Sequence, residues 1–123
     1  MIWLAVALGG AAGSVLRYGA GRLAINYFGP TTVLATFAVN VSGSFALGLF
    51  YALAAERTPL PVEIRALISI GLIGGYTTFS TFSFETISLL ESGEPTRAAA
   101  SVLANLILGL ASAYLGMLVA RLA

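Results

Sequence analysis

Four long apolar stretches constrain this chain more than any other feature of its sequence. They cover residues 2–27, 31–54, 64–90 and 98–122, and each is near the ~20 residues that a helix needs to cross a bilayer. Hydrophobic residues make up 59% of the 123 residues and charged residues only 9%, which is far outside the range of soluble domains. The sequence therefore predicts an all-α integral membrane protein, with residues 1–123 forming a single domain of four transmembrane helices.

Two missing residue types exclude several kinds of chemistry. The chain has neither cysteine nor histidine. This removes thiolate and imidazole metal ligands, thiol nucleophiles and the commonest proton shuttle. Metal catalysis and triad chemistry are therefore excluded, and we expect that the protein is not an enzyme. We expect the lipid bilayer as a partner and no nucleic acid.

An unusual run of glycines, hydroxyls and phenyls lies inside the third apolar stretch. Residues 71–85 read Gly-Leu-Ile-Gly-Gly-Tyr-Thr-Thr-Phe-Ser-Thr-Phe-Ser-Phe-Glu. Gly74 and Gly75 are poor helix formers, and two β-branched threonines follow shortly after. We therefore expect the third helix to break near Gly74–Thr77 and to restart. Carbonyls freed by a break at membrane depth must be satisfied by protein, water or an ion, so the run predicts a binding site.

The second half of that run places polar and aromatic side chains close together. Phe79, Phe82 and Glu85 recur every three residues, so they lie along one side of the restarted helix. An alternative interpretation is that the hydroxyls bond to carbonyls four residues earlier while the phenyls fill gaps between helices. The density of the cluster favours a functional site.

Stripes of polar and small residues also follow the second and fourth apolar stretches. They repeat every four residues, at positions 36, 40, 44 and 48 and at positions 101, 105, 109 and 113. Asn40 lies close to mid-membrane, where an amide must be hydrogen-bonded. Two interpretations stay open, a bond between helices and an amide donor that lines a path.

The first apolar stretch carries small residues and one arginine at helical spacing. Gly9, Gly13 and Gly21 lie four or eight residues apart, with Arg17 between them. Small residues at such spacing allow helix backbones to approach closely. Arg17 is expected at or near an interface, where its head can snorkel or pair with a carboxylate in a structural or vestibule role.

Arginine placement bears on orientation in the membrane. If four helices cross in turn, one face of the membrane carries Arg57, Arg65 and Arg121, and the opposite face carries Arg17, Arg22 and Arg97. Orientation normally follows an excess of Lys and Arg on the cytoplasmic side, and here there is none. The sequence thus predicts no strong preferred topology, and the chain could pair with an inverted copy of itself. If Arg17 lies too deep to count, the balance tilts by one.

Three parts of the sequence carry a family resemblance: Asn40, the run from Gly74 to Glu85, and the opening Gly9-Gly10-x-x-Gly13-x-x-x-Arg17-Tyr18. Together they resemble the CrcB/Fluc family of microbial fluoride ion channels, and the resemblance covers the whole chain. It implies a multi-pass protein of the cytoplasmic (inner) membrane of a prokaryote. It also implies an antiparallel, dual-topology homodimer with two fluoride pathways beside a central structural sodium ion (Na⁺). The implied activity is passive export of fluoride, which reduces its toxicity.

The resemblance also implies roles for individual residues. The sodium ligands would be the backbone carbonyls of Gly74 and Thr77. The fluoride pore would be lined by Asn40, Phe79, Phe82, Ser80 and Thr81, with Glu85 at its far end. Further candidates for the pore or vestibule are Arg17, Ser101 and Asn105, the last two standing where the family often shows a tyrosine and a serine. Carbonyl oxygens suit a hard cation, whereas amide and hydroxyl hydrogens and phenyl edges suit a small hard anion.

Two other functions compete with the fluoride channel. A small dual-topology, proton-coupled exporter of cationic drugs is expected to hold a carboxylate deep in its first helix, and this chain has none there. Glu85 is its one candidate for that role. A packing subunit without transport activity would leave the hydroxyl and phenyl run without a purpose.

Overall fold

The computed structural model describes every residue except 57 and 58, and all regular structure in the described residues is helical. The first two spans are α1 (Ile2–Phe28) and α2 (Val33–Glu56). The third is composed of α3 (Val62–Arg65), the π-helix η1 (Ala66–Ile73), α4 (Gly74–Tyr76) and α5 (Phe79–Glu91). The fourth is composed of α6 (Pro95–Leu103), the π-helix η2 (Ala104–Leu108) and α7 (Gly109–Leu122).

These helices confirm the prediction of four membrane spans. Within the described residues, four helical stretches are long and apolar enough to cross a membrane, namely Ile2–Phe28, Val33–Ala55, Val62–Glu91 and Pro95–Leu122. The predicted start of the fourth helix at residue 98 is too late. The helix begins at Pro95, because proline lacks the N–H that the first turn leaves unbonded anyway.

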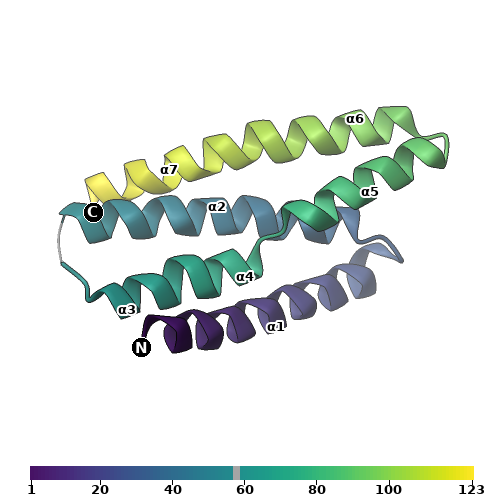
Figure 1. Ribbon diagram of the computed structural model, residues 1–123. Helices are drawn as coiled ribbons and strands as arrows, with labels where there is room; N and C mark the ends of the chain where they lie inside the picture. Colours follow the sequence, from purple (N-terminus) through teal and green to yellow (C-terminus); the bar gives the residue numbers. More distant parts are fainter. Residues whose placement is uncertain (57–58) are drawn as a thin grey trace.

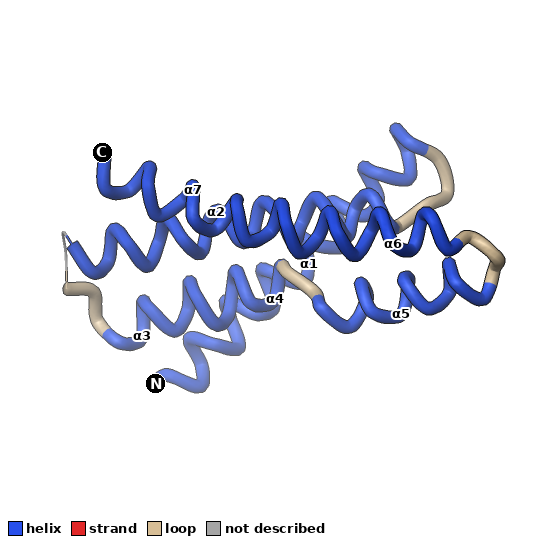
Figure 2. The backbone as a smooth tube through the Cα atoms, turned by 90° about the horizontal axis from the view of Figure 1, so that it is seen from above, coloured by secondary structure: helices blue, strands red, loops and turns tan. Residues whose placement is uncertain are grey.

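The break in the third span moves the chain from one helix partner to another. Figure 1 shows α3 and α4 running beside α1, and α5 continuing beside α6. The α2 helix packs along α7. From above, the short loop between α4 and α5 lies midway along the molecule, and both chain termini are at the same end (Figure 2). The loop is therefore placed where a site at membrane depth would need it.

Glycines determine how closely these helices approach. A Cβ atom added to Gly13 of α1 would lie 2.1 Å from the Leu72 carbonyl oxygen, and one added to Gly9 would lie 2.2 Å from that of Leu67. The α2 and α7 helices meet in the same way, since a Cβ on Gly48 would lie 2.1 Å from the Ala113 oxygen. The predicted close-packing role of the stripe in the first helix is thus confirmed for Gly9 and Gly13, whereas a Cβ on Gly21 would meet no neighbouring helix.

The predicted break near Gly74–Thr77 is confirmed, and it lies at the threonine end of that range rather than at the glycines. Gly74 is helical, with φ −63° and ψ −37°, and helix α4 continues to Tyr76. The chain becomes extended at Thr77 (φ −82°, ψ 161°) and Thr78 (φ −153°, ψ 115°). Gly75 serves close packing instead, because a Cβ there would lie 2.8 Å from the Gly10 carbonyl oxygen. Extended backbone suits β-branched threonine, which accounts for the position of the break.

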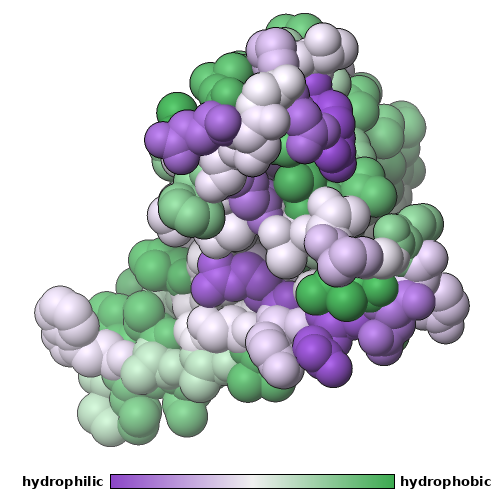
Figure 3. Space-filling model, turned by 90° about the vertical axis from the view of Figure 1, so that its right-hand side faces the viewer, coloured by the Kyte–Doolittle hydropathy of each residue, from purple (hydrophilic) through white to green (hydrophobic). Residues whose placement is uncertain are grey.

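Hydrophilic side chains are exposed at the ends of the spans, and large apolar side chains are exposed along them. Figure 3 shows hydrophilic residues gathered on the end of the molecule where the α1–α2 and α5–α6 loops lie. Large apolar side chains are exposed along the spans, among them Leu8, Val15, Ile70 and Leu110. Trp3 and Tyr27 are exposed near opposite ends of α1, as aromatic residues at the two membrane interfaces would be.

Candidate functional site

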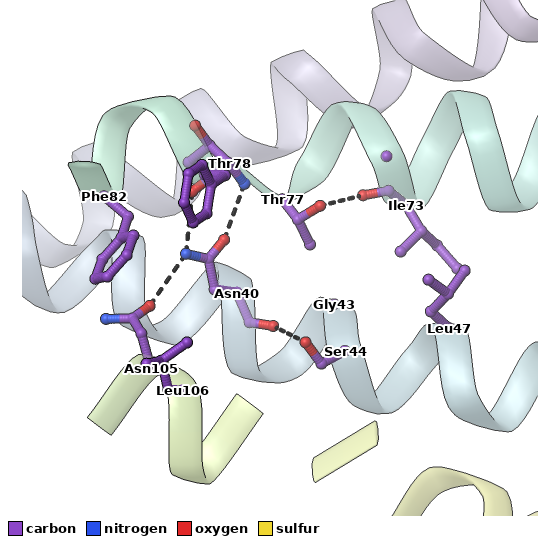
Figure 4. Close-up of a pocket in the computed structure, with 12 residues that line it drawn as sticks. Asn40, Gly43, Ser44, Leu47, Ile73, Thr77, Thr78, Phe82, Asn105 and Leu106 are labelled. Atoms are coloured by element: carbon purple, nitrogen blue, oxygen red, sulfur yellow. Dashed lines mark hydrogen bonds between the residues drawn. The ribbon is translucent and has the colours of Figure 1, made fainter. Parts of the chain in front are cut away.

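The centre of the candidate site is a pair of hydrogen bonds between Asn40 of α2 and the backbone of Thr78. The Thr78 N–H donates to Asn40 Oδ1 at 2.8 Å, and Asn40 Nδ2 donates to the Thr78 carbonyl at 3.1 Å (Figure 4). In an unbroken helix, the Thr78 N–H would donate to the carbonyl of Gly74 instead. A carboxamide carries both a donor and an acceptor, so it can take the place of a peptide group. Asn40 therefore satisfies both polar groups that the break exposes at Thr78.

A second amide extends this pair to the fourth span. Asn40 Nδ2 also donates to Asn105 Oδ1 at 3.1 Å, and Asn105 Nδ2 donates to the Ser101 carbonyl at 2.9 Å. Asn105 lies in η2, a type of helical segment that is frequent at functional sites. The bond between helices that sequence analysis left open for Asn40 is thus present. Three spans meet at this point.

A cavity of about 270 Å³ opens beside the amide pair. Its lining includes six residues to which sequence analysis had assigned a site role: Asn40, Gly74, Thr77, Phe79, Phe82 and Asn105. The ring centroids of Phe79 and Phe82 are 5.7 Å apart with an interplanar angle of 56°. The Phe82 side chain is buried, with 8% exposed, whereas Phe79 is 76% exposed. The structure therefore brings the expected carbonyl, amide and phenyl groups into one place.

The backbone carbonyls at the break differ in their partners. Arg17 Nη1 of α1 donates to the Thr77 carbonyl at 3.2 Å. The Gly74 carbonyl does not receive the Thr78 N–H, which is bonded to Asn40. Each carbonyl oxygen has two lone pairs, so Thr77 retains one after binding Arg17. Oxygen donors of this kind fit a hard cation such as sodium, although two per chain are fewer than the roughly six that such a cation gathers.

Thr81 lies beside a different cavity from that of Asn40, and Ser80 lies next to Thr78 at the break. The Thr78 side chain caps the N-terminus of α5, accepting from the Thr81 N–H at 3.2 Å. Its hydroxyl donates to Thr81 Oγ1 at 3.0 Å and lies 3.4 Å from Ser80 Oγ. Thr81 and Thr78 then line a cavity of about 380 Å³ between α1 and α2, together with Arg17 and Thr36. The hydroxyl groups thus lie on the Arg17 side of the break.

Glu85 is held by two threonines of the second span. Its side chain is buried, with 8% exposed. Thr36 Oγ1 donates to Glu85 Oε1 at 3.0 Å, and Thr32 Oγ1 also donates to this oxygen. A buried carboxylate needs such donors. Sequence analysis had assigned no role to the side chains of Thr32 and Thr78. Threonine is a typical residue just before the first turn of a helix, where its side chain accepts from a backbone N–H, so the cap at Thr78 was visible in the sequence.

Two hydroxyls of the run, and that of Thr86 just after it, follow the alternative interpretation. Thr77, Ser83 and Thr86 donate to the carbonyls four residues before them, at 3.1, 2.9 and 2.8 Å. These bonds satisfy the hydroxyls within their own helix. The hydroxyls of Ser80 and Thr81 are instead hydrogen-bonded to the hydroxyl of Thr78 at the break.

Comparison with known proteins gives a consistent picture. Residues 4–117 match the family model described as CrcB-like protein, Camphor Resistance (CrcB). A protein of Shewanella amazonensis named Fluoride-specific ion channel FluC is 51% identical over 113 residues, which is 92% of this chain and 90% of that protein. Proteins of the same name from Allorhizobium ampelinum and Rhizobium etli are 44% and 45% identical, each over 94% of this chain and 93% of their own length.

Proposed function

The chain belongs to the CrcB-like protein family, and on that premise we propose that it is a fluoride-selective ion channel that lets fluoride leave the cell passively. The observation that carries the proposal is the cavity at the break, where amide groups meet two phenyl rings inside a multi-pass membrane protein. An anion held there would meet hydrogen-bond donors and ring edges instead of water.

Fluoride requires an environment of this kind because it is small and strongly hydrated. A dry pathway has to replace the lost water with hydrogen-bond donors, because losing water is costly for an ion that finds no donors. The amides of Asn40 and Asn105 and the positive edges of Phe79 and Phe82 would supply them in the cavity at the break. The hydroxyls of Thr81, in the cavity beside Arg17, and of Ser80, next to Thr78, would add to them. Chloride is larger, and less of its hydration has to be replaced. Selectivity for fluoride would therefore arise from a narrow pathway that is densely lined with hydrogen-bond donors.

The direction of transport follows from the membrane potential. Fluoride enters cells in acidic surroundings as neutral HF, which ionises inside. An inside-negative potential of 100 mV then favours exit of the anion by about 2.3 kcal/mol. A channel needs no coupling to another energy source. The competing proton-coupled drug exporter is disfavoured, because α1 contains no Asp or Glu and the Glu85 carboxylate is held by two threonines.

We further propose that two copies associate in antiparallel orientation around a structural sodium ion in the inner membrane. One chain offers the ion only the carbonyls of Gly74 and Thr77, which are too few to coordinate it. Two copies would double this number. The exposed phenyls of Phe79 and Phe84 on α5 offer apolar surface to such a partner. Unwound backbone carbonyls within a membrane are a known means of binding sodium.

Fluoride efflux from liposomes that contain the purified protein tests the function. With a potassium ionophore clamping the voltage, we expect efflux that follows the applied potential, needs no pH gradient and far exceeds chloride efflux. Transport of a cationic drug driven by a pH gradient, without fluoride efflux, would instead support the exporter. Replacing sodium by a bulky organic cation in all solutions should reduce the amount of dimer, and an unchanged dimer would contradict the sodium site.

A further inference from the structure

We propose that the Tyr76 hydroxyl is a positioning group: it fixes the end of α4 on α2 and thereby holds the Thr77 carbonyl in place for a sodium ion. This inference rests on the proposed sodium site and deepens it, because it names a side chain that touches no ion but determines how well an ion is held. The observation that carries it is the hydrogen bond between the hydroxyls of Tyr76 and Ser42.

This hydrogen bond joins the last residue of α4 to α2 and has a determined direction. The oxygen atoms of the Tyr76 and Ser42 hydroxyls are 3.0 Å apart. Ser42 Oγ donates its one hydrogen to the Ala38 carbonyl at 2.6 Å. A hydroxyl has a single hydrogen and two lone pairs, so Tyr76 has to be the donor to Ser42.

The bond lies at the level of the break, within the membrane. Ser42 is two residues after Asn40, which is bonded to the break, and Tyr76 directly precedes Thr77, where the chain becomes extended. Water that could replace a lost partner is absent from the hydrocarbon core of a bilayer. The Tyr76 hydroxyl therefore depends on Ser42 for the acceptor of its hydrogen.

Gly43, the next residue of α2, brings the end of α4 close enough for this bond. A Cβ added to Gly43 would lie 2.2 Å from Thr77 Cγ2 and 3.3 Å from Cδ1 of the Tyr76 ring. The ring and the threonine methyl group thus pack directly on the backbone of α2. Packing on Gly43 and the hydrogen bond to Ser42 together fix the position of residues 76 and 77 against α2.

The Thr77 carbonyl comes directly after these contacts. The Thr77 N–H donates to the Ile73 carbonyl at 3.0 Å, and the backbone then leaves the helix with ψ 161°. Arg17 donates to the carbonyl oxygen itself, at 3.2 Å. Fixing the residue before the carbonyl limits the positions that its oxygen can take. Ligands that are held in place before binding lose less freedom when the ion arrives, so the ion is bound more tightly.

Tyr76→Phe tests the inference, because it removes the hydroxyl and keeps the ring on Gly43. The measurement is the amount of dimer formed by the purified full-length protein in detergent as sodium replaces a bulky organic cation. We expect the sodium concentration for half-maximal dimer to rise about three- to tenfold, the usual effect of one hydrogen bond between membrane helices. Saturating sodium should restore the wild-type amount of dimer by mass action.

Three further variants isolate this bond. Ser42→Ala should raise the same sodium concentration, and combining it with Tyr76→Phe should add little, because both changes remove one bond. Ser42→Thr keeps an accepting hydroxyl and should behave like the wild type. Tyr114→Phe in α7 is the matched control, since the Tyr114 side chain is 59% exposed and makes no hydrogen bond within the described residues.

The outcomes separate this inference from the sodium site on which it rests. A hydroxyl that only stabilises the fold would lower the unfolding temperature equally at every sodium concentration. An unchanged sodium requirement in Tyr76→Phe and Ser42→Ala, or failure of both to form dimers at saturating sodium, would overturn the positioning role while the sodium site stands. A wild-type dimer that forms equally well without sodium would overturn the sodium site and this inference with it.

Discussion

The side-chain amide of Asn40 and the backbone of Thr78 are hydrogen-bonded to each other in both directions across the break. Arg17 supplies the corresponding donor for the next carbonyl, that of Thr77. The extended residues between α4 and α5 are thus held by side chains from two other spans. A non-helical segment can persist at membrane depth only with such partners.

Replacing Asn40 by aspartate should abolish fluoride flux. The carboxylate can still accept the Thr78 N–H, but it cannot donate to the Thr78 carbonyl or to Asn105, and its charge repels an anion in the cavity. We also expect the free energy of unfolding to fall by about 1–3 kcal/mol because a buried acceptor loses its partner. Ser44→Ala is a control that changes the same cavity, since Ser44 donates only to its own helix, at the Asn40 carbonyl. Efflux from Asn40→Asp equal to that of the control would contradict the prediction.

Adding one methyl group at Gly13 should destabilise the packing of the third span on α1. The new Cβ would lie 2.1 Å from the Leu72 carbonyl oxygen, which belongs to helix backbone and cannot move aside alone. We expect Gly13→Ala to cost about 1–3 kcal/mol, as overpacking generally does. The matched control is Gly19→Ala in the same helix, where no described heavy atom comes within 4 Å. Thermal unfolding in detergent measures both, and equal midpoints would show that this contact is not tight.

Phe79→Ile and Phe82→Ile should both reduce fluoride flux strongly, because isoleucine keeps apolar bulk but lacks the positive ring edge. Their effects on stability should differ. Phe82 is 8% exposed and its replacement leaves a cavity, whereas Phe79 is 76% exposed. Voltage-clamped efflux, normalised to the assembled protein, measures the first effect and thermal unfolding the second. Near-normal flux in both variants would show that the rings do not line the path.

Tags on the C-terminus should be found on both sides of the membrane in one population. The arginine balance of three against three predicts this, although Arg57 lies outside the residues that the structure describes. Arg17 is bonded to the carbonyl at the break within the span, which favours the interpretation that it is too deep to count. Without it the balance is three against two, a bias of one charge, so we still expect both orientations. Two lysines added to one face should impose a single orientation, and this variant alone should conduct no fluoride. Coexpression with a variant biased to the opposite orientation should restore fluoride flux. Detection of one orientation in the wild type would argue against dual topology.

The sequence alone was sufficient for the number of the spans and for most of their limits, although the fourth begins at Pro95 rather than at residue 98. Span length follows from the thickness of the bilayer, and apolar runs of the required length are visible without any knowledge of packing. The glycine spacing in the first helix likewise indicated the close packing of Gly9 and Gly13, because residues four apart share one helix face. A site in the third span was foreseeable since hydroxyls, phenyls and weak helix formers are concentrated there.

The partners of each polar group were decided by the tertiary structure. Gly74 and Gly75 have low helix propensity, but both are helical, Gly75 packs against Gly10 of α1, and the break lies at Thr77 and Thr78. The sequence showed that Asn40 needed hydrogen bonds, and the placement of α5 and η2 determined that Thr78 and Asn105 provide them. Propensity and hydropathy are local properties of the chain, whereas the acceptor that a buried amide finds depends on where the other helices bring their own polar groups.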